Sequence, residues 1–202
     1  MNNIVITIGR EYGSGGRYIG ELVAKELNIP FYDKELLKEA YQRNGCKYSN
    51  LEEYDEKKKS DLMKMFSLID MNNYDDTFTF EQYQHLINET IKDIANNKSC
   101  VILGRNSNNI LKDRTNAINI FIYSNDLEFK LERKMKLENL SRSDALKKLN
   151  TVDKQRKKYY EAVNKNATWA SKSEYDYLID SSILGIEKTK DLIVDLYKKL
   201  EK

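Results

Sequence analysis

Residues 4–17 read IVITIGREYGSGGR, and this stretch decides the fold. Its first half, Ile4 to Ile8, is a short run of apolar, mostly β-branched residues, which predicts a strand buried on both faces. Four glycines and a serine then cluster before a segment with helical periodicity, Gly16 to Leu27, whose apolar stripe is Ile19, Leu22, Val23 and Leu27. The pattern is therefore a buried strand, a glycine-rich turn and an amphipathic helix.

Such a turn is suited to holding phosphate. Glycine permits positive φ and a close approach of the backbone to a ligand, and successive amides at a helix N-terminus favour an anion. The standard G-x-x-x-x-G-K-[ST] spacing is absent, so Arg17 is the candidate for the missing cation. The alternative is a tight turn without ligand, which needs fewer glycines than four. The candidate phosphate-binding residues are Gly13, Ser14, Gly15, Gly16 and Arg17.

Four further apolar runs follow along the chain, and helical segments separate them. The runs are Ile29 to Tyr32, Cys100 to Leu103, Ile118 to Tyr123 and Tyr177 to Ile179; further helices are expected over Tyr83 to Ala95 and Glu187 to Leu200. Strands that alternate with helices indicate βαβ units, and hence an α/β fold with a parallel sheet and right-handed crossovers.

Two segments between strands do not fit this core and are expected to be helical insertions. Residues 34–80 are polar, with three successive lysines at 57–59, and residues 127–172 are strongly basic and helical. Since no internal repeat or low-complexity linker separates them from the core, residues 1–202 are expected to form one domain.

Composition excludes several classes of function. Lys+Arg number 34 and Asp+Glu 32, a net charge of +2, so no overall field favours nucleic acid or a membrane surface. Cys46 and Cys100 lack metal spacing, and His85 is the only histidine, which argues against an ordinary zinc site and a serine or cysteine triad. Without a membrane span or signal-peptide pattern, a reduced cytoplasmic setting is expected.

The chain resembles the cytidylate kinase-like family, relatives of the P-loop nucleoside monophosphate kinases. The first strand and its glycine loop are similar to the family's P-loop, and Val101 to Arg105 is similar to a strand that ends in a Gly-Arg pair. The similarity continues in order through most of the chain, in Asn28 to Asp33, Ile120 to Ile122, Glu132 to Met135, Asp153 to Arg156, Ile179 to Ser181 and Ile186-Glu187.

Two positions depart from the family pattern. Gly16 stands where a cytidylate kinase has its P-loop lysine, and Arg17 falls one position later. Lys34 replaces the serine that usually follows the aspartate after the second strand. The first departure bears on phosphoryl transfer and the second on selectivity for CMP.

The resemblance implies a three-layer α/β/α fold with a five-stranded parallel sheet, P-loop NTPase-like, with an acceptor-binding insertion at 34–80 and a lid at 127–172. It implies ATP-dependent transfer to a nucleoside monophosphate, CMP or dCMP, with ATP and Mg²⁺ as cofactors and nucleotides as partners; no protein ligand of the metal is assigned. The implied catalytic residues are Arg17, Arg105, Arg133 and Arg156, and Asp33 and Arg105 would bind the acceptor.

Each of these residues also has a structural interpretation. Arg105 could form an ion pair, Arg133 and Arg156 could lie on solvated helix faces, and Asp33 could cap a helix that starts at Lys34. Asp180 is expected to be a strand-end turn and cap rather than a nucleotide contact. At the level of function, the alternatives are an anion- or nucleotide-binding regulator that has lost transfer, or a kinase for another small acceptor.

Overall fold

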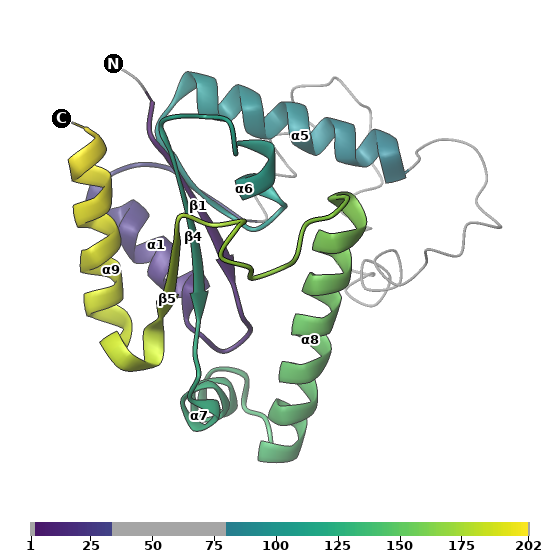
Figure 1. Cartoon of the computed structure of the whole chain (residues 1–202). Coiled ribbons are helices and arrows are strands. Elements are labelled where there is room, and N and C mark those ends of the chain that lie inside the picture. The colour runs from purple at the N-terminus through teal and green to yellow at the C-terminus, as the bar shows by residue number, and fades with distance from the viewer. Residues whose placement is uncertain (1–2, 34–79, 202) are drawn as a thin grey trace, which may run out of the picture. The chain divides into compact units, whose positions relative to one another are not determined.

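The computed structural model describes residues 3–33 and 80–201, with the backbone alone for 80–83 (Figure 1). The chain divides into two compact units, Met1–Asp33 with Ile91–Lys202, and Lys34–Thr90. The expected acceptor-binding insertion at 34–80 lies almost wholly outside the described residues, and the account below concerns the first unit. Helix α5, Phe80–Asn97, belongs to both units.

A five-stranded, all-parallel sheet forms the centre of the first unit, in the order β2-β3-β1-β4-β5. In register, Val5 pairs with Cys100 of β3 on one side and with Ala117 of β4 on the other. The strands are β1 Val5–Arg10, β2 Phe31–Tyr32, β3 Cys100–Leu103, β4 Ala117–Tyr123 and β5 Tyr177–Asp180. The predicted parallel α/β fold is confirmed.

Helices cover both sides of this sheet, as Figure 1 shows. Helices α1 (Gly16–Leu27) and α9 (Ser181–Leu200) lie together on one face, and α6 (Ser107–Ile110) and α8 (Arg142–Val163) lie on the other side. Helix α7, Leu127–Glu138, follows β4. The arrangement is the expected three-layer α/β/α architecture.

The main core lies between the sheet and the α1–α9 layer. Alternate residues of β1, Ile6 and Ile8, are fully buried there against Ile19 of α1 and Ile193 of α9. Alternation follows from the pleat, which sends successive side chains to opposite faces. The core therefore fixes β1 in the middle of the sheet and α1 directly behind it, with the glycine loop between them.

Most element boundaries match the expectations to within a few residues. The second strand is shorter than Ile29 to Tyr32, because the backbone turns at Asn28 (φ 53) to end α1 before the strand begins at Phe31. The last helix begins earlier than Glu187: a first turn from Ser181 precedes a break at Gly185 (φ 75). The Asp180 side chain accepts from the Ser182 amide and caps this turn, so the structural interpretation of Asp180 is confirmed.

The segment 127–172 contains α7, α8 and the loop that follows α8. Side chains cap both helices, since Asp126 accepts from the amides of Glu128 and Phe129, and Ser141 accepts from that of Asp144. Among the described helices, none is long and apolar enough to cross a lipid bilayer.

Candidate functional site

The loop between β1 and α1 leaves backbone donors unpaired. Gly13 (φ 87) and Gly15 (φ 83) both require positive φ, and Gly15 is the N-cap residue of α1. No described residue accepts a hydrogen bond from the amides of Gly13, Ser14 or Gly15, whereas the Gly16 amide donates to Ser14 Oγ at 3.3 Å. Unpaired amides at a helix N-terminus form an anion-binding cradle.

Side chains from later elements hold this loop in place and cover it. The Ser181 hydroxyl donates to the Ser14 carbonyl at 2.6 Å. A Cβ added at Gly13 would lie 2.8 Å from Lys130 Cβ, and one added at Gly15 would lie 2.5 Å from Ile186 Cδ1. Gly13 is therefore needed for packing as well as for backbone conformation, whereas a side chain at position 15 would have to displace the end of Ile186.

Arg133 of α7 reaches the same loop. Its Nε lies 3.6 Å from the position of a Cβ built on Gly15, and its guanidinium also lies 5.6 Å from the Tyr18 ring centroid. Burial lowers the pKa of Arg133, and the nearby Tyr18 opposes that shift. The structure thus brings Arg133 to the unpaired amides.

Arg17 is already paired. Its Nε donates to Asp33 Oδ2 at 2.8 Å and its Nη1 lies 2.8 Å from Glu21 Oε1, while the side chain is 56% exposed. Two carboxylates therefore neutralise the residue that was expected to replace the P-loop lysine. Asp33, which was expected to bind the acceptor nucleotide, forms an ion pair with Arg17 in this structure.

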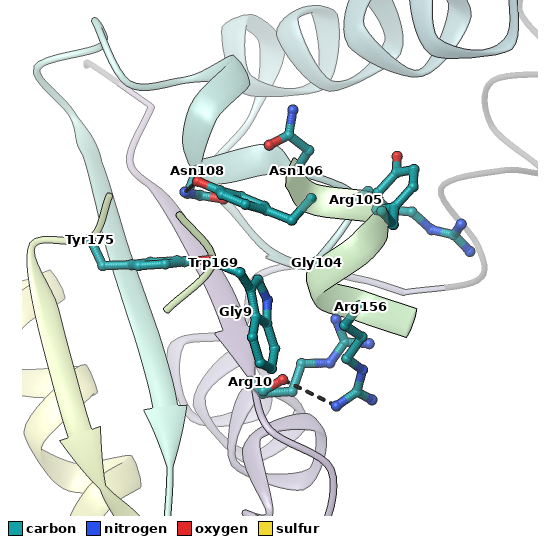
Figure 2. A pocket seen from close by; sticks show the side chains of 11 residues that line it. Gly9, Arg10, Gly104, Arg105, Asn106, Asn108, Arg156, Trp169 and Tyr175 are labelled. Carbon is teal, nitrogen blue, oxygen red and sulfur yellow. Dashed lines mark hydrogen bonds between the residues drawn. The ribbon is translucent and has the colours of Figure 1, made fainter. Parts of the chain in front are cut away.

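A second feature of the site is a pocket of about 60 Å³ at the carboxyl ends of β1 and β3, shown in Figure 2. Arg10 ends β1, Arg105 follows β3 and Arg156 comes from α8. The lining is completed by Gly9, Gly104, Asn106, Asn108, Tyr159, Tyr160, Trp169 and Tyr175. In open α/β sheets, ligands bind beyond the carboxyl ends of the strands, where this pocket lies.

The backbone that carries Arg105 is unusual. Gly104, Arg105 and Asn106 have successive positive φ values of 70, 55 and 60°. Left-handed conformations cost energy outside glycine and gather at ligand sites. Here they are fixed by a buried pair of amide side chains, since Asn106 Nδ2 donates to Asn164 Oδ1 at 2.9 Å.

Arg156 connects α8 to the end of β1. Its Nη1 donates to the Arg10 carbonyl at 3.1 Å and to Asp153 Oδ1 at 3.2 Å. Burial lowers the pKa of Arg156, and the Asp153 carboxylate opposes that shift. Asp153 also accepts from the Tyr12 amide at 2.7 Å, so a single carboxylate joins α8 to the glycine loop.

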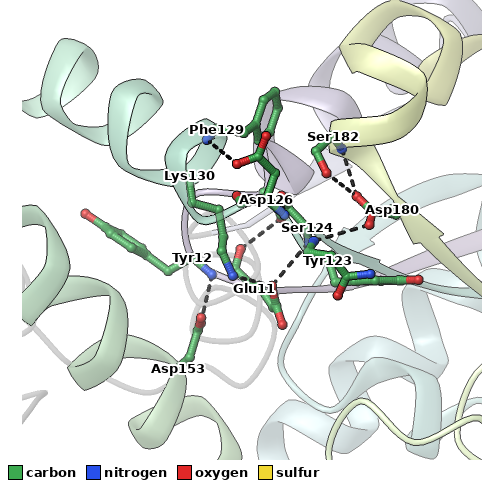
Figure 3. A network of polar contacts seen from close by, with 12 residues as sticks. Glu11, Tyr12, Tyr123, Ser124, Asp126, Phe129, Lys130, Asp153, Asp180 and Ser182 are labelled. Carbon is green, nitrogen blue, oxygen red and sulfur yellow. Dashed lines mark hydrogen bonds and ion pairs between the residues drawn. The ribbon is translucent and has the colours of Figure 1, made fainter.

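A polar network, drawn in Figure 3, extends this connection to α7 and β5. Lys130 Nζ lies 3.0 Å from Glu11 Oε2, which also accepts from the Ser124 amide at 3.2 Å. Asp180 accepts from the Asn125 amide at 3.2 Å. The network therefore ties the start of the glycine loop to the segment 127–172.

The predicted arginines thus fall into separate places. Arg105 and Arg156 line one pocket, Arg133 lies over the glycine loop, and Arg17 is paired with Asp33. Sequence reasoning missed Arg10 and Lys130. Arg10 is the last residue of a strand that ends at the ligand edge, which is the signal that could have found it; Lys130 precedes Arg133 by three positions, on the same helix face.

The aromatic residues of the segment 127–172 are largely packing residues. Trp169 meets Phe121 edge-on at 5.1 Å between ring centroids, and Tyr160 Oη accepts from Asn108 at 2.8 Å. Burial raises the pKa of Tyr160 to about 12. These contacts form one wall of the pocket and position the end of α8.

Comparisons with known proteins show the family and agree with the fold. A family model described as the cytidylate kinase-like family matches residues 5–183. An uncharacterized protein from Eubacterium ventriosum ATCC 27560 is 27% identical with a TM-score of 0.73, over 97% of this chain and 99% of that chain. Shikimate kinase from Bacteroides thetaiotaomicron is similar in fold, with 14% identity and a TM-score of 0.52 over 96% of this chain and 98% of that one. No curated protein matches the sequence.

Proposed function

The chain belongs to the cytidylate kinase-like family, and on that premise we propose that it transfers the terminal phosphoryl group of ATP to a nucleoside monophosphate, with CMP and dCMP as the first acceptors to test. The observation that carries the proposal is the set of unpaired amides at Gly13, Ser14 and Gly15 beside the Arg133 guanidinium. Amides and a guanidinium that converge on one space are the groups that bind phosphate oxygens.

In this proposal the donor phosphates lie against the unpaired amides of residues 13–15, and the Gly16 amide joins them by giving up its bond to Ser14 Oγ. An oxygen of the acceptor phosphate attacks the γ-phosphorus, and the bond from that phosphorus to the departing ADP oxygen breaks. Little covalent chemistry is required of the protein, so catalysis rests on positioning and on neutralising charge. Arg133 would act at the donor side, and Arg105 and Arg156 at the acceptor side.

Arg17 and Asp33 have a conditional role in this scheme. Arg17 contacts phosphate only if it exchanges its present partners, Glu21 and Asp33, for phosphate oxygens. The exchange would also release the Asp33 carboxylate to bind the acceptor. The Arg17–Asp33 ion pair should therefore be present in the free protein and broken when nucleotides are bound.

The segment 127–172 is proposed to act as the lid. It supplies Arg133 and Arg156, and it is joined to the loop through Asp153 and Lys130. Covering the phosphates excludes water and prevents hydrolysis of ATP without transfer. Residues 34–80 are proposed as the acceptor-binding region by family likeness alone.

The described residues offer an unequal fit to the two cofactors. The loop amides fit a nucleotide polyphosphate, but no group of three His, Cys, Asp or Glu side chains among residues 3–33 and 84–201 could hold a metal ion. Mg²⁺ would therefore be bound by the nucleotide phosphates and water, as this ion commonly is. When bound, it would neutralise charge on the donor phosphates.

The test is an ADP-release assay with ATP and Mg²⁺ across the nucleoside monophosphates. We expect turnover with at least one acceptor, and a loss of about 10²–10³-fold in kcat for Arg133→Gln, the effect typical of removing one transition-state donor. Arg142→Gln is the matched control, because Arg142 is an exposed α8 residue paired with Glu128. No turnover with any acceptor would exclude this proposal.

A second candidate is a nucleotide-binding regulator without transfer activity. It is favoured by a specific observation: position 16 has no side chain, and two carboxylates already neutralise the neighbouring Arg17. This candidate predicts that ATP raises the melting temperature while ADP release stays at background.

A further inference from the structure

The Arg10 side chain occupies the space that a side chain at position 16 would need. A Cβ added at Gly16 would lie 2.7 Å from Arg10 Cβ and 3.3 Å from Arg10 Cγ. Real Cβ atoms do not approach so closely, and neither of the Arg10 atoms is the free end of a flexible chain. A side chain at position 16 would therefore meet the Cβ and Cγ atoms of Arg10, and its Cβ would also lie 3.3 Å from Ile122 Cβ.

The far end of the Arg10 side chain passes close to a second glycine. A Cβ added at Gly104 would overlap Arg10 Nη1, so the guanidinium passes directly over the backbone that follows β3. Figure 2 shows this path from the end of β1 to the pocket that Arg105 and Arg156 also line. Two glycines, far apart in sequence, thus make room for one arginine.

No described residue pairs with the Arg10 guanidinium. Its Nε is buried without a hydrogen-bond partner. Burial lowers the pKa of Arg10 to about 9; repulsion from Arg156 and Arg105 adds to that shift, and the Asp33 carboxylate opposes it. A buried, unpaired guanidinium beside other guanidiniums is costly unless an anion completes the site.

The pocket has room for a phosphate group rather than a whole nucleotide. Its volume of about 60 Å³ is roughly four times the minimum that one water molecule requires. Guanidinium groups bind phosphate through paired, charge-assisted hydrogen bonds. Both the volume of the pocket and its positive charge therefore suit a dianion of the size of phosphate.

We propose that Arg10, from the end of β1, supplies the phosphate-binding charge that the glycine loop lacks at position 16, and that with Arg105 and Arg156 it binds the phosphate group of the acceptor. The assignment to the acceptor rests on the proposed function. The binding of a phosphate-sized dianion by Arg10 does not, and it is tested without nucleotide.

The first experiment measures binding of inorganic phosphate by calorimetry and by the rise in melting temperature. Arg10→Gln and Arg10→Met should weaken binding about ten- to a hundredfold, because each removes charged hydrogen bonds. Arg10→Lys keeps the charge and should lose less, and the exposed Arg142→Gln should bind like the wild type. Unchanged phosphate affinity in folded Arg10→Gln or Arg10→Met protein would overturn the proposal.

The second experiment tests the shared space with a two-site cycle. Gly16→Lys should lower the melting temperature, since the new side chain meets Arg10. Arg10→Gly combined with Gly16→Lys should recover part of the stability and part of the phosphate affinity, because removing both Cβ and Cγ of residue 10 lets the lysine enter the vacated space. If the effects of the two changes simply add, Arg10 does not exclude a side chain at position 16.

The outcomes also separate this proposal from the proposed function. Arg10-dependent phosphate binding without turnover on any acceptor would remove the kinase proposal and leave the Arg10 site standing. If Arg10→Gln leaves both turnover and phosphate affinity unchanged, the kinase proposal stands and the Arg10 site is ruled out.

Discussion

At the scale of single residues, the glycines of this site are selected by what lies next to them. Gly13 faces Lys130, Gly15 faces Ile186, and Gly16 faces Arg10. Gly13 and Gly15 also need positive φ, which an L-residue adopts only at a cost. The loop is thus constrained twice, by backbone conformation and by close packing.

Gly15→Ala should incur both the cost of backbone strain and the cost of close packing. The new Cβ would lie 2.5 Å from Ile186 Cδ1, in a backbone with φ 83. We expect a loss of about 2–4 kcal/mol in the free energy of unfolding, part from strain and part from overpacking. The measurement is urea denaturation.

Ile186→Val removes only the atom that clashes and provides the control. The double variant should be more stable than the sum of the single effects, by roughly 0.5 kcal/mol or more. Additive effects would mean that Ile186 does not limit the size of residue 15.

Much of the site could be predicted from the sequence at this scale, and part could not. The glycine loop and Arg105 were found because each directly follows a buried strand, and such strand ends meet at one edge of the sheet. The path of the Arg10 side chain and the pairing of Arg17 with Asp33 depend on side-chain directions in the folded protein. Local sequence patterns do not encode those directions.

At the scale of elements, Glu138 at the end of α7 joins three parts of the fold. Its carboxylate accepts from Lys134 of α7 at 2.8 Å, from Lys148 of α8 at 2.5 Å and from the Tyr12 hydroxyl of the glycine loop at 2.6 Å. The contact to Tyr12 spans 126 positions in the sequence. The helices were predictable from periodicity, but this connection between them was not.

Glu138 should give the stability of the protein an acid-dependent component. Burial works against the ionised form, but hydrogen bonds from Lys134, Lys148 and Tyr12 outweigh it and lower the pKa of Glu138 from 4.5 to about 2. A carboxyl whose pKa is lowered by folding stabilises the folded state above its ordinary pKa, and that contribution is lost as the pH falls through the folded value. The window is therefore about pH 4.5 to 2.

Glu138→Gln should cost roughly 1–3 kcal/mol in the free energy of unfolding at pH 7, and the difference from the wild type should shrink across that window. Urea denaturation at several pH values provides the measurement. Glu128→Gln is the control on the same helix, because its pair with Arg142 is exposed and worth little. A difference at pH 7 no larger than that of the control would show that Glu138 does not carry the connection.

At the scale of the whole molecule, charge is gathered locally rather than distributed. The net charge is only +2, yet Arg10, Arg105 and Arg156 reach one pocket from β1, from the turn after β3 and from α8. The strand order explains the convergence, because β1 lies between β3 and β4 and its end is therefore flanked by the connections of both. The amino-acid composition could exclude a strong electrostatic field over the whole protein, but it could not show that these three arginines lie together.

Such a cluster should cost stability in the absence of ligand. Arg10 is a base whose pKa falls to about 9 on folding, so the folded state disfavours its charged form at every pH below that value. Replacing a buried, uncompensated charge by an apolar side chain of similar length commonly stabilises a protein. Arg10→Met should therefore raise the free energy of unfolding of the ligand-free protein by about 1–3 kcal/mol at pH 7.

Saturating phosphate should reverse the order of stability, since only the wild type gains binding energy from the anion. Denaturant titrations of both proteins, with and without phosphate and at matched ionic strength, measure the two differences. If Arg10→Met were less stable than the wild type without ligand, Arg10 would be a structural residue whose guanidinium is stabilised by the fold itself. If it is more stable there and less stable with phosphate, the protein gives up stability in order to hold a charge ready for its ligand.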